Sequence, residues 1–273
     1  MPFTLAHPAA AVPFSRKGLV LSALVVGSMA PDFQYFLGLV PGVRDVIALF
    51  PVLNFSHTPV GLFLFCLPVG LALLWLFHRF LKLPLLSLLP ASHQHALLPY
   101  AGNFSFAPWR RLALILLSLW LGALTHIFWD SFTHSYGWFV QAIPLFTAVI
   151  LQAGSTPIYT FTLLQHVSTL VGMALLGIWY WRRLRMNSPD PTINPAPFLP
   201  EATRLGALLV LILAGILLAG IYRFPGWTLI SDLHGLRWYV GETVVTGMLI
   251  LFGELLLFSG LWHFVRAKGR QMH

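Results

Sequence analysis

Long apolar runs constrain this sequence more than any other feature. A backbone inside a bilayer must satisfy its own hydrogen bonds, so a run of about 20 apolar residues predicts a membrane-spanning helix. Four runs meet that standard, and a fifth is interrupted by Glu242 and Glu254. The predicted spans cover residues 59–78, 112–131, 159–181, 205–223 and 239–264. The sequence therefore predicts an all-α polytopic membrane bundle.

Composition supports a membrane protein and excludes several other classes. Charged residues make up only 9% of the 273 residues, whereas soluble domains carry about 25%. The net charge is +8, but the basic residues lie at the ends of apolar runs, without a basic stripe or motif that would indicate a nucleic-acid partner. Cys66 is the single cysteine, which excludes an intrachain disulfide and a thiolate zinc site. We expect membrane lipid to be the main partner, and the sequence does not indicate an oligomeric state.

The segments outside the spans predict a helical hairpin and several connections. Residues 4–14 and 18–30 predict two short helices that return Asp32 towards His7. Residues 83–109 and 186–201 predict loops, and residues 139–152 are too short to span, which leaves an interfacial or a re-entrant segment open. We predict one membrane domain with three parts: the hairpin (1–38), a ligand-bearing core (59–181) and two C-terminal spans (205–264).

Basic residues predict the orientation of the chain, because Lys and Arg favour the cytoplasmic side of short loops. If the five spans alternate in direction, eleven of the Lys and Arg residues fall on one side of the membrane. They are Arg79, Lys82, Arg110, Arg111, Arg182, Arg183, Arg185, Arg204, Arg266, Lys268 and Arg270. Arg44, Arg223 and Arg237 fall on the other side. This predicts a multi-pass protein of the inner (cytoplasmic) membrane with both predicted loops and the C-terminus in the cytoplasm.

The second predicted span ends in a run of potential metal ligands. The stretch LTHIFWDSFTH, residues 124–134, places His126, Asp130 and His134 at i, i+4 and i+8. Residues four apart share one face of a helix, so His126 and Asp130 lie within reach of one ion. A carboxylate at the end of a spanning helix is also typical of a functional site.

The predicted topology delivers further ligands to the same, extracytoplasmic face. His57 precedes the first span, and His166 lies about two turns into the third span. If the N-terminal hairpin enters from this side, His7 and Asp32 join the group. The predicted ligand set is His7, Asp32, His57, His126, Asp130, His134 and His166.

Imidazole and carboxylate ligands predict a divalent metal, with zinc favoured and manganese or iron as alternatives. Seven ligands exceed a single tetrahedral site, so we expect two or more ions. A site of this kind activates water and stabilises the oxygens of a phosphoryl displacement. Asp32 or Asp130 would orient the water or bridge two ions.

Other polar residues carry weaker signals. Arg237 belongs to a predicted extracytoplasmic segment and would bind a substrate phosphate, although an ordinary loop is the alternative. His78, His263 and His273 are interpreted as helix-contact or interfacial residues. His93 and His95 lie in the predicted loop 83–109, away from the ligand set.

Four ordered segments carry a resemblance to known families. MPFTLAHPAA, GSMAPDFQYF, FSHTPVG and LGALTHIFWDSFTHSYG resemble an uncharacterised family of bacterial multi-pass membrane proteins, defined by a domain of unknown function, over nearly the whole chain. The PD, SHT and HxxxD elements also resemble YdjM-type membrane-bound metal-dependent hydrolases. The order of the ligand set is remotely similar to zinc-dependent phospholipase C and P1-type nuclease.

The remote resemblance implies three zinc ions, but this sequence departs from the pattern. Leu170 stands four residues after His166, where those enzymes have a glutamate ligand. The N-terminal amino ligand of those enzymes also has no equivalent here. One ion would therefore be missing or would be held differently, with Glu242 as a substitute.

These observations predict a metal-dependent hydrolase acting on a phosphoester, with a lipid headgroup favoured because the site faces the headgroup layer. The main alternative is a non-enzymatic metal-binding or transport protein. Transporters often carry midplane ionisable groups and repeated halves, and neither is visible here. A third alternative is a structural protein whose polar groups only join helices, and it predicts tolerance of Asp130→Asn.

Overall fold

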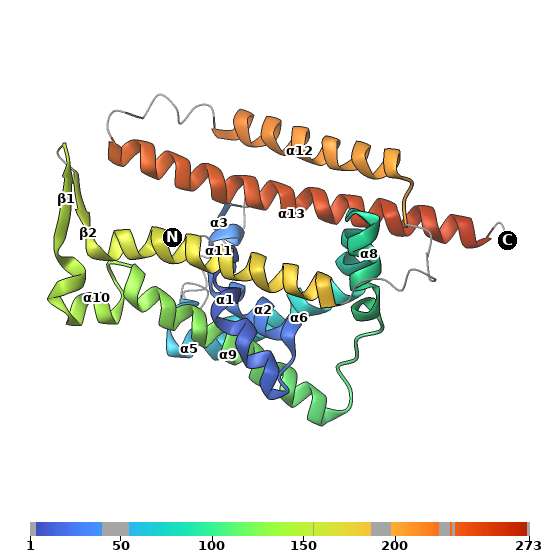
Figure 1. Ribbon diagram of the computed structural model, residues 1–273, viewed down its shortest axis with the longest axis horizontal. Helices are drawn as coiled ribbons and strands as arrows, with labels where there is room; N and C mark the ends of the chain where they lie inside the picture. The colour runs from blue at the N-terminus through green and yellow to red at the C-terminus, as the bar shows by residue number, and fades with distance from the viewer. Residues whose placement is uncertain are drawn as a thin grey trace. The chain divides into compact units, whose positions relative to one another are not determined.

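The computed structural model describes residues 4–39, 55–154, 156–186, 198–223, 230 and 233–271 (Figure 1). Among these residues, five helices are long and apolar enough to cross a membrane. They are Pro59–Ser87, Trp109–Ala142, Thr160–Met186, Glu201–Arg223 and Trp238–Ala267. All five predicted spans and the all-α class are therefore confirmed. The chain divides into unit 1, residues 1–74 and 105–179, and unit 2, residues 75–104 and 180–273.

Unit 1 begins with the predicted helical hairpin. Its first arm contains η1 (Thr4–Ala6), α1 (Pro8–Ala11) and η2 (Val12–Lys17), and its second arm contains α2 (Leu21–Met29), η3 (Ala30–Asp32) and α3 (Phe33–Leu39). Gly18 joins the arms with a φ of 81°, a left-handed conformation that glycine adopts without a Cβ penalty. The reversal returns Asp32 to the level of the first turn, where Thr4 Oγ1 donates to Asp32 Oδ2 at 2.6 Å.

The hairpin packs closely on α9 (Trp109–Thr133) through two glycines. A Cβ added at Gly27 would overlap the Leu119 carbonyl, and one added at Gly122 would overlap the Leu24 carbonyl. Small residues of this kind let helix backbones approach each other in membranes. The contact fixes α2, and with it Asp32, against the helix that carries His126.

The N-terminal part of the first span completes the core of unit 1. The first span contains α5 (Pro59–Gly61), the π-helical η5 (Leu62–Cys66) and α6 (Leu67–Leu76). Leu62, Phe65 and Cys66 pack with Ala30 and Ala123 in a buried apolar cluster. This cluster joins the first span, the hairpin and α9.

A short peripheral segment follows α9. It comprises α10 (Trp138–Ala142), η8 (Pro144–Thr147) and the antiparallel strands β1 (Val149–Ala153) and β2 (Thr156–Tyr159), which turn near Gly154. Residues 139–152, predicted to be too short to span, therefore form a helix end, a 3-10 turn and a strand. The long α11 (Thr160–Met186) follows, and its Gly172 packs against the Ala6 backbone.

Unit 2 contains η6 (Phe77–Leu81), α7 (Lys82–Ser87), α8 (Ala91–Leu97) and η7 (Leu98–Ala101). Much of the predicted loop 83–109 is thus helical, and that part of the prediction is wrong. The helix Pro59–Ser87 continues past residue 78 and through Pro84 without a break, and Pro90 directly precedes the short α8. The predicted loop 186–201 falls largely outside the described residues.

The last two spans of unit 2, α12 (Glu201–Arg223) and α13 (Leu233–Gln271), lie side by side (Figure 1). Arg223 Nη1 lies 3.8 Å from Glu242 Oε2 and also contacts the rings of Trp238 and Tyr239. Glu242, which the sequence suggested as a substitute metal ligand, is therefore paired with an arginine in unit 2.

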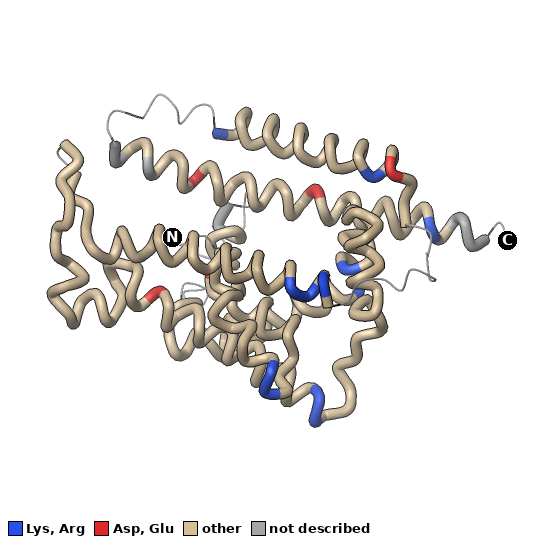
Figure 2. Tube along the Cα trace, in the orientation of Figure 1, with Lys and Arg blue, Asp and Glu red and all other residues tan. Residues whose placement is uncertain are grey.

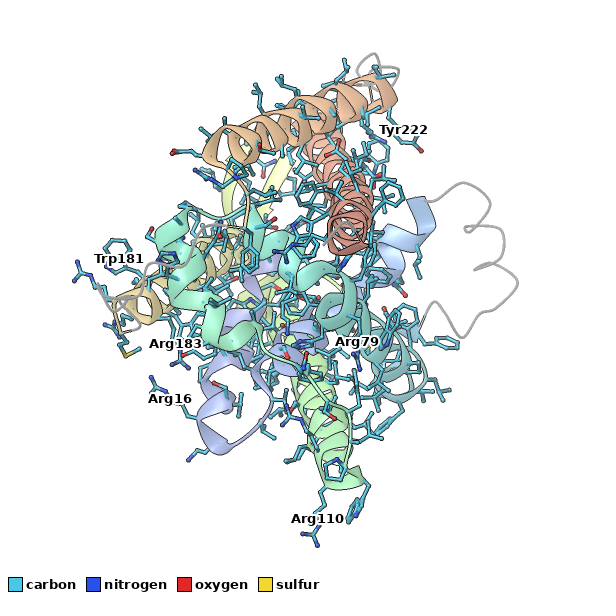
Figure 3. All side chains as sticks on the ribbon, turned by 90° about the vertical axis from the view of Figure 1, so that its right-hand side faces the viewer. Arg16, Arg79, Arg110, Trp181, Arg183 and Tyr222 are labelled. Atoms are coloured by element: carbon cyan, nitrogen blue, oxygen red, sulfur yellow. The ribbon has the colours of Figure 1, made fainter. Side chains whose placement is uncertain are left out.

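Lys and Arg lie mostly near the ends of the long helices (Figure 2). In unit 1, Arg16 and Arg110 lie towards the same end (Figures 2 and 3), and Asp130 lies twenty residues further along the same helix as Arg110, which corresponds to about 30 Å. In unit 2, Arg183 stacks on Tyr100 and Arg266 stacks on Phe198. In unit 1, Arg110 and Asp130 therefore lie near opposite ends of α9, as the predicted span requires.

Candidate metal centre

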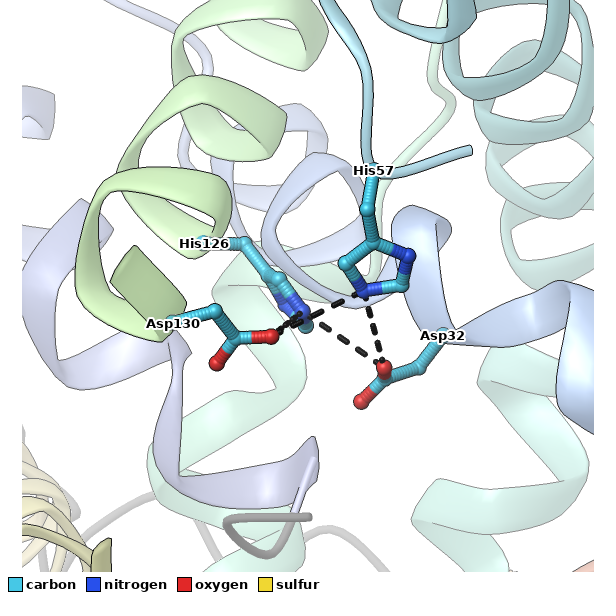
Figure 4. A group of neighbouring side chains, drawn as sticks. All are labelled: Asp32, His57, His126 and Asp130. Atoms are coloured by element: carbon cyan, nitrogen blue, oxygen red, sulfur yellow. Dashed lines mark ion pairs between the residues drawn. The ribbon is translucent and has the colours of Figure 1, made fainter. Parts of the chain in front are cut away.

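Four side chains from three segments of unit 1 converge on one point. Asp32 ends η3, His57 precedes α5, and His126 and Asp130 lie one turn apart on α9. One ligand atom from each lies within 4.8 Å of all the others. Figure 4 shows the two imidazoles and two carboxylates pointing towards one another.

The spacing of these atoms suits a divalent cation. His57 Nε2 lies 3.4 Å from Asp32 Oδ1 and 3.6 Å from Asp130 Oδ2. His126 Nε2 lies 3.5 Å from Asp32 Oδ1 and 3.2 Å from Asp130 Oδ2. Ligand bonds of about 2.1 Å in a tetrahedral site place neighbouring ligand atoms about 3.4 Å apart. The four nitrogen–oxygen distances therefore match the edges of such a site.

Several of these polar atoms are buried without a hydrogen-bond partner. His126 is 0% exposed and Asp130 is 4% exposed. Within the described part of the chain, His57 Nε2, His126 Nε2 and Asp130 Oδ1 have no hydrogen-bond partner. An unpartnered buried polar group costs about 1–3 kcal/mol, and a bound cation would remove this cost at the nitrogens. The residues present therefore fit a metal ion.

Contacts behind the ligands orient them. His126 Nδ1 lies 2.7 Å from the Ser28 carbonyl oxygen, which can only accept, so Nδ1 carries a proton and Nε2 faces the centre. Ser56 Oγ lies 2.8 Å from His57 Nδ1. The Thr4 hydroxyl donates a hydrogen bond to Asp32 Oδ2, and Asp32 Oδ1 faces His57 and His126. Asp32, His57 and His126 are thus each held by a residue that was not predicted from the sequence.

His7 and His134 form a second group around the other oxygen of Asp130. His7 Nε2 lies 3.6 Å and His134 Nδ1 lies 3.4 Å from Asp130 Oδ1. The His7 ring also stacks on the His126 ring with centroids 3.7 Å apart. Asp130 therefore faces a different set of imidazoles with each of its oxygens.

The ionisation of the two hairpin residues suits metal binding. Burial, with a further contribution from His126, lowers the pKa of His7 to about 3, so its imidazole is neutral at pH 7. Burial acts to raise the pKa of Asp32, but the adjacent His126, His57 and Thr4 outweigh it and hold that pKa well below its usual range. A neutral imidazole and an ionised carboxylate are the forms that ligate metals.

The structure describes the other selected residues only in part. His166 is exposed on α11, unlike the buried ligands. Arg237 lies on α13 in unit 2, and its side chain is outside the described residues. His78 stacks on Phe104, and His263 Nε2 donates to the Phe80 carbonyl at 2.9 Å, which agrees with their interpretation as helix-contact residues. His273 lies outside the described residues.

Two tyrosines at the accessible side of the cluster were missed. The Tyr35 ring lies 5.7 Å from the His57 ring, and the Tyr136 ring lies 5.1 Å from the His134 ring. Their exposed fractions are 36% and 54%. Burial, followed by the nearby Asp32 carboxylate, raises the pKa of Tyr35 and keeps its hydroxyl a donor. The sequence could have indicated these tyrosines by their nearness to predicted ligands, since Tyr35 follows Asp32 by three residues and Tyr136 follows His134 by two.

The fold and the cluster define a class: a multi-pass membrane protein with a buried group of Asp and His residues that could hold a metal ion. Within that class, the chain belongs to the family described as Domain of unknown function (DUF4184), whose model matches residues 1–260. This confirms the predicted membership of a domain-of-unknown-function family. Searches among curated proteins and among solved structures gave no match.

Proposed function

We propose that this protein is a membrane-bound metal-dependent hydrolase that acts on a phosphoester, with a lipid headgroup as the favoured substrate. The observation that carries the proposal is the convergence of two carboxylates and two imidazoles on one point, where the Nε2 atoms of His57 and His126 are buried without a hydrogen-bond partner among the described atoms. The ordered motifs that resemble YdjM-type hydrolases and, remotely, zinc-dependent phospholipase C also support the proposed hydrolase function.

Asp32, His57, His126 and Asp130 would hold the first ion, with zinc favoured and manganese or iron as alternatives. A divalent cation bound there supplies Lewis acidity and lowers the pKa of water. His7 and His134, together with Asp130 Oδ1, offer ligands for a second ion. His166 and Arg237 remain proposed contributors, as a further ligand and a phosphate contact respectively.

The residues of the chain divide the remaining tasks. Asp32 Oδ2 already accepts the Thr4 hydroxyl, whereas Asp130 Oδ1 has no hydrogen-bond partner among the described atoms. In a site with one ion, Asp130 Oδ1 would orient an attacking water and accept its proton, whereas in a site with two ions Asp130 would instead bridge them. Tyr35 and Tyr136, at the accessible side, would donate hydrogen bonds to the phosphoryl oxygens, where charge develops during displacement.

The position along α9 supports a site at the membrane surface. Asp130 lies near the C-terminal end of the helix, and Arg110 lies at its start. Their separation of about 30 Å matches the thickness of the hydrocarbon core. Because Arg favours the cytoplasmic side, we place the cluster at the extracytoplasmic face of the inner membrane. This position at a helix end also differs from the midplane sites typical of transporters.

Removal of the Tyr136 hydroxyl tests the proposed reaction. We expect Tyr136→Phe to lower kcat on a phosphodiester or phospholipid roughly 10- to 100-fold, because a donor to the transition state is lost. Bound metal, measured by elemental analysis, should not change. Tyr222→Phe, at an exposed position in unit 2, is the matched control and should keep full activity. A metal-loaded wild type without activity on any phosphoester would contradict the hydrolase and favour a metal-binding or transport protein.

A further inference from the structure

Unit 1 carries an apolar groove of about 550 Å³, a volume typical of small-ligand pockets. Its walls come from the hairpin, α9, η8 and α11. Half of the ten lining residues are aromatic: Phe14, Phe128, Trp129, Phe132 and Phe146. Thr133 and Ser168 add hydroxyl groups to the wall.

The groove and the metal-ligand cluster share a wall. Trp129 packs the edge of its ring against His7, with centroids 5.7 Å apart, and its indole N–H donates to Ser168 Oγ at 3.1 Å. Thr133 Oγ1 lies 3.2 Å from His134 Nδ1. His7 and His134 are the two imidazoles that face Asp130 Oδ1. A ligand in the groove is therefore separated from the cluster by one layer of side chains.

The membrane identifies the chemistry of the occupant. The groove lies between α9 and α11, which belong to two of the five candidate membrane spans, so hydrocarbon is the medium available to fill it. The cluster lies near the end of α9, which the proposed function assigns to the level of the headgroups, and its groups suit the phosphoester chemistry proposed above. A lipid with one chain in the groove would place its phosphate next to the cluster.

We propose that the groove binds one acyl chain of a phospholipid substrate and thereby positions the headgroup ester at the cluster. This inference rests on the proposed function and narrows its substrate class to phosphoesters that carry an acyl chain. An acyl chain in a bilayer is already out of water, so its transfer into the groove gains little hydrophobic free energy. The groove would act by holding the chain in place, so we expect phospholipids to be preferred over soluble phosphodiesters because the bound chain positions the ester.

Leu164→Trp tests the groove because Leu164 lines it on α11, and an indole there would fill it. Leu163→Trp is the matched control, since Leu163 is its exposed neighbour on the same helix. The probe is phosphatidylcholine with a diazirine in the middle of one acyl chain, crosslinked to the full-length protein in vesicles and mapped by mass spectrometry. We expect labelling of residues 128–133 and 164–168 in the wild type, at least a fivefold decrease in Leu164→Trp, and no decrease in Leu163→Trp.

The outcomes separate the groove from the proposed function. Equal labelling of both variants, or no labelling of the groove residues in the wild type, would overturn the groove proposal. Metal content in both variants should equal that of the wild type, which shows that the fold is kept. Labelling without any hydrolysis would leave the groove in place and remove the hydrolase. Hydrolysis of soluble and lipid phosphoesters at equal rates, unchanged in Leu164→Trp, would keep the hydrolase and remove the groove.

Discussion

Asp130→Ala is expected to abolish metal binding while the protein stays folded. Asp130 Oδ2 faces His57 and His126, and Asp130 Oδ1 faces His7 and His134, so the substitution removes a ligand from both groups. Loss of an outer-shell partner alone typically costs 10- to 100-fold in metal affinity. We expect the loss of this inner ligand to exceed about 100-fold. Elemental analysis of protein purified in detergent without chelator measures the effect.

Three comparisons sharpen this experiment. Asp130→Asn keeps the side-chain volume and should still lose most of the metal, whereas a purely structural cluster would tolerate it. Glu254→Gln removes a carboxylate in unit 2 and should retain the metal. His166→Ala tests the exposed histidine and should also retain metal at the centre formed by Asp32, His57, His126 and Asp130. Full occupancy in Asp130→Ala, or no metal in the wild type even after metal is added back, would end the metal-centre interpretation.

Gly122→Leu is expected to destabilise the protein and to remove the metal at the same time. A Cβ at Gly122 would overlap the Leu24 carbonyl and crowd the Ser28 amide, so α2 must move away from α9. The Ser28 carbonyl orients His126, and η3, which follows α2, carries Asp32. Overpacking of this kind costs about 1–3 kcal/mol, and we expect the upper end of that range because the clash involves backbone atoms on both helices.

Thermal unfolding in detergent, followed by metal analysis, measures both effects of Gly122→Leu. Gly177→Leu is the matched control, since a Cβ at this α11 position meets no atom within 4 Å. The control should unfold at the wild-type temperature and keep its metal. A Gly122→Leu variant with wild-type unfolding and full metal content would show that the contact between α2 and α9 does not determine the site.

The sequence by itself determined the elements that depend on local composition. The spans were predictable because a bilayer requires about 20 apolar residues in a row, and the five helices agree with that requirement. The hairpin was predictable from two short apolar segments separated by a polar turn. The His126 and Asp130 pair was predictable because residues four apart share one face of a helix.

Only the tertiary structure decided which ligands meet and what holds them. His126 donates a hydrogen bond to the Ser28 carbonyl, and Asp32 accepts one from the Thr4 hydroxyl. Neither contact follows from apolar periodicity, because each joins residues far apart in the chain. The close approach of Gly27 to the α9 backbone and of Gly122 to the α2 backbone also joins residues far apart in the chain, so it does not follow from the periodicity either. The length of an apolar run and the spacing of residues along it predict a single helix and the residues that share one of its faces. The site depends on the distances between several helices, and packing sets those distances.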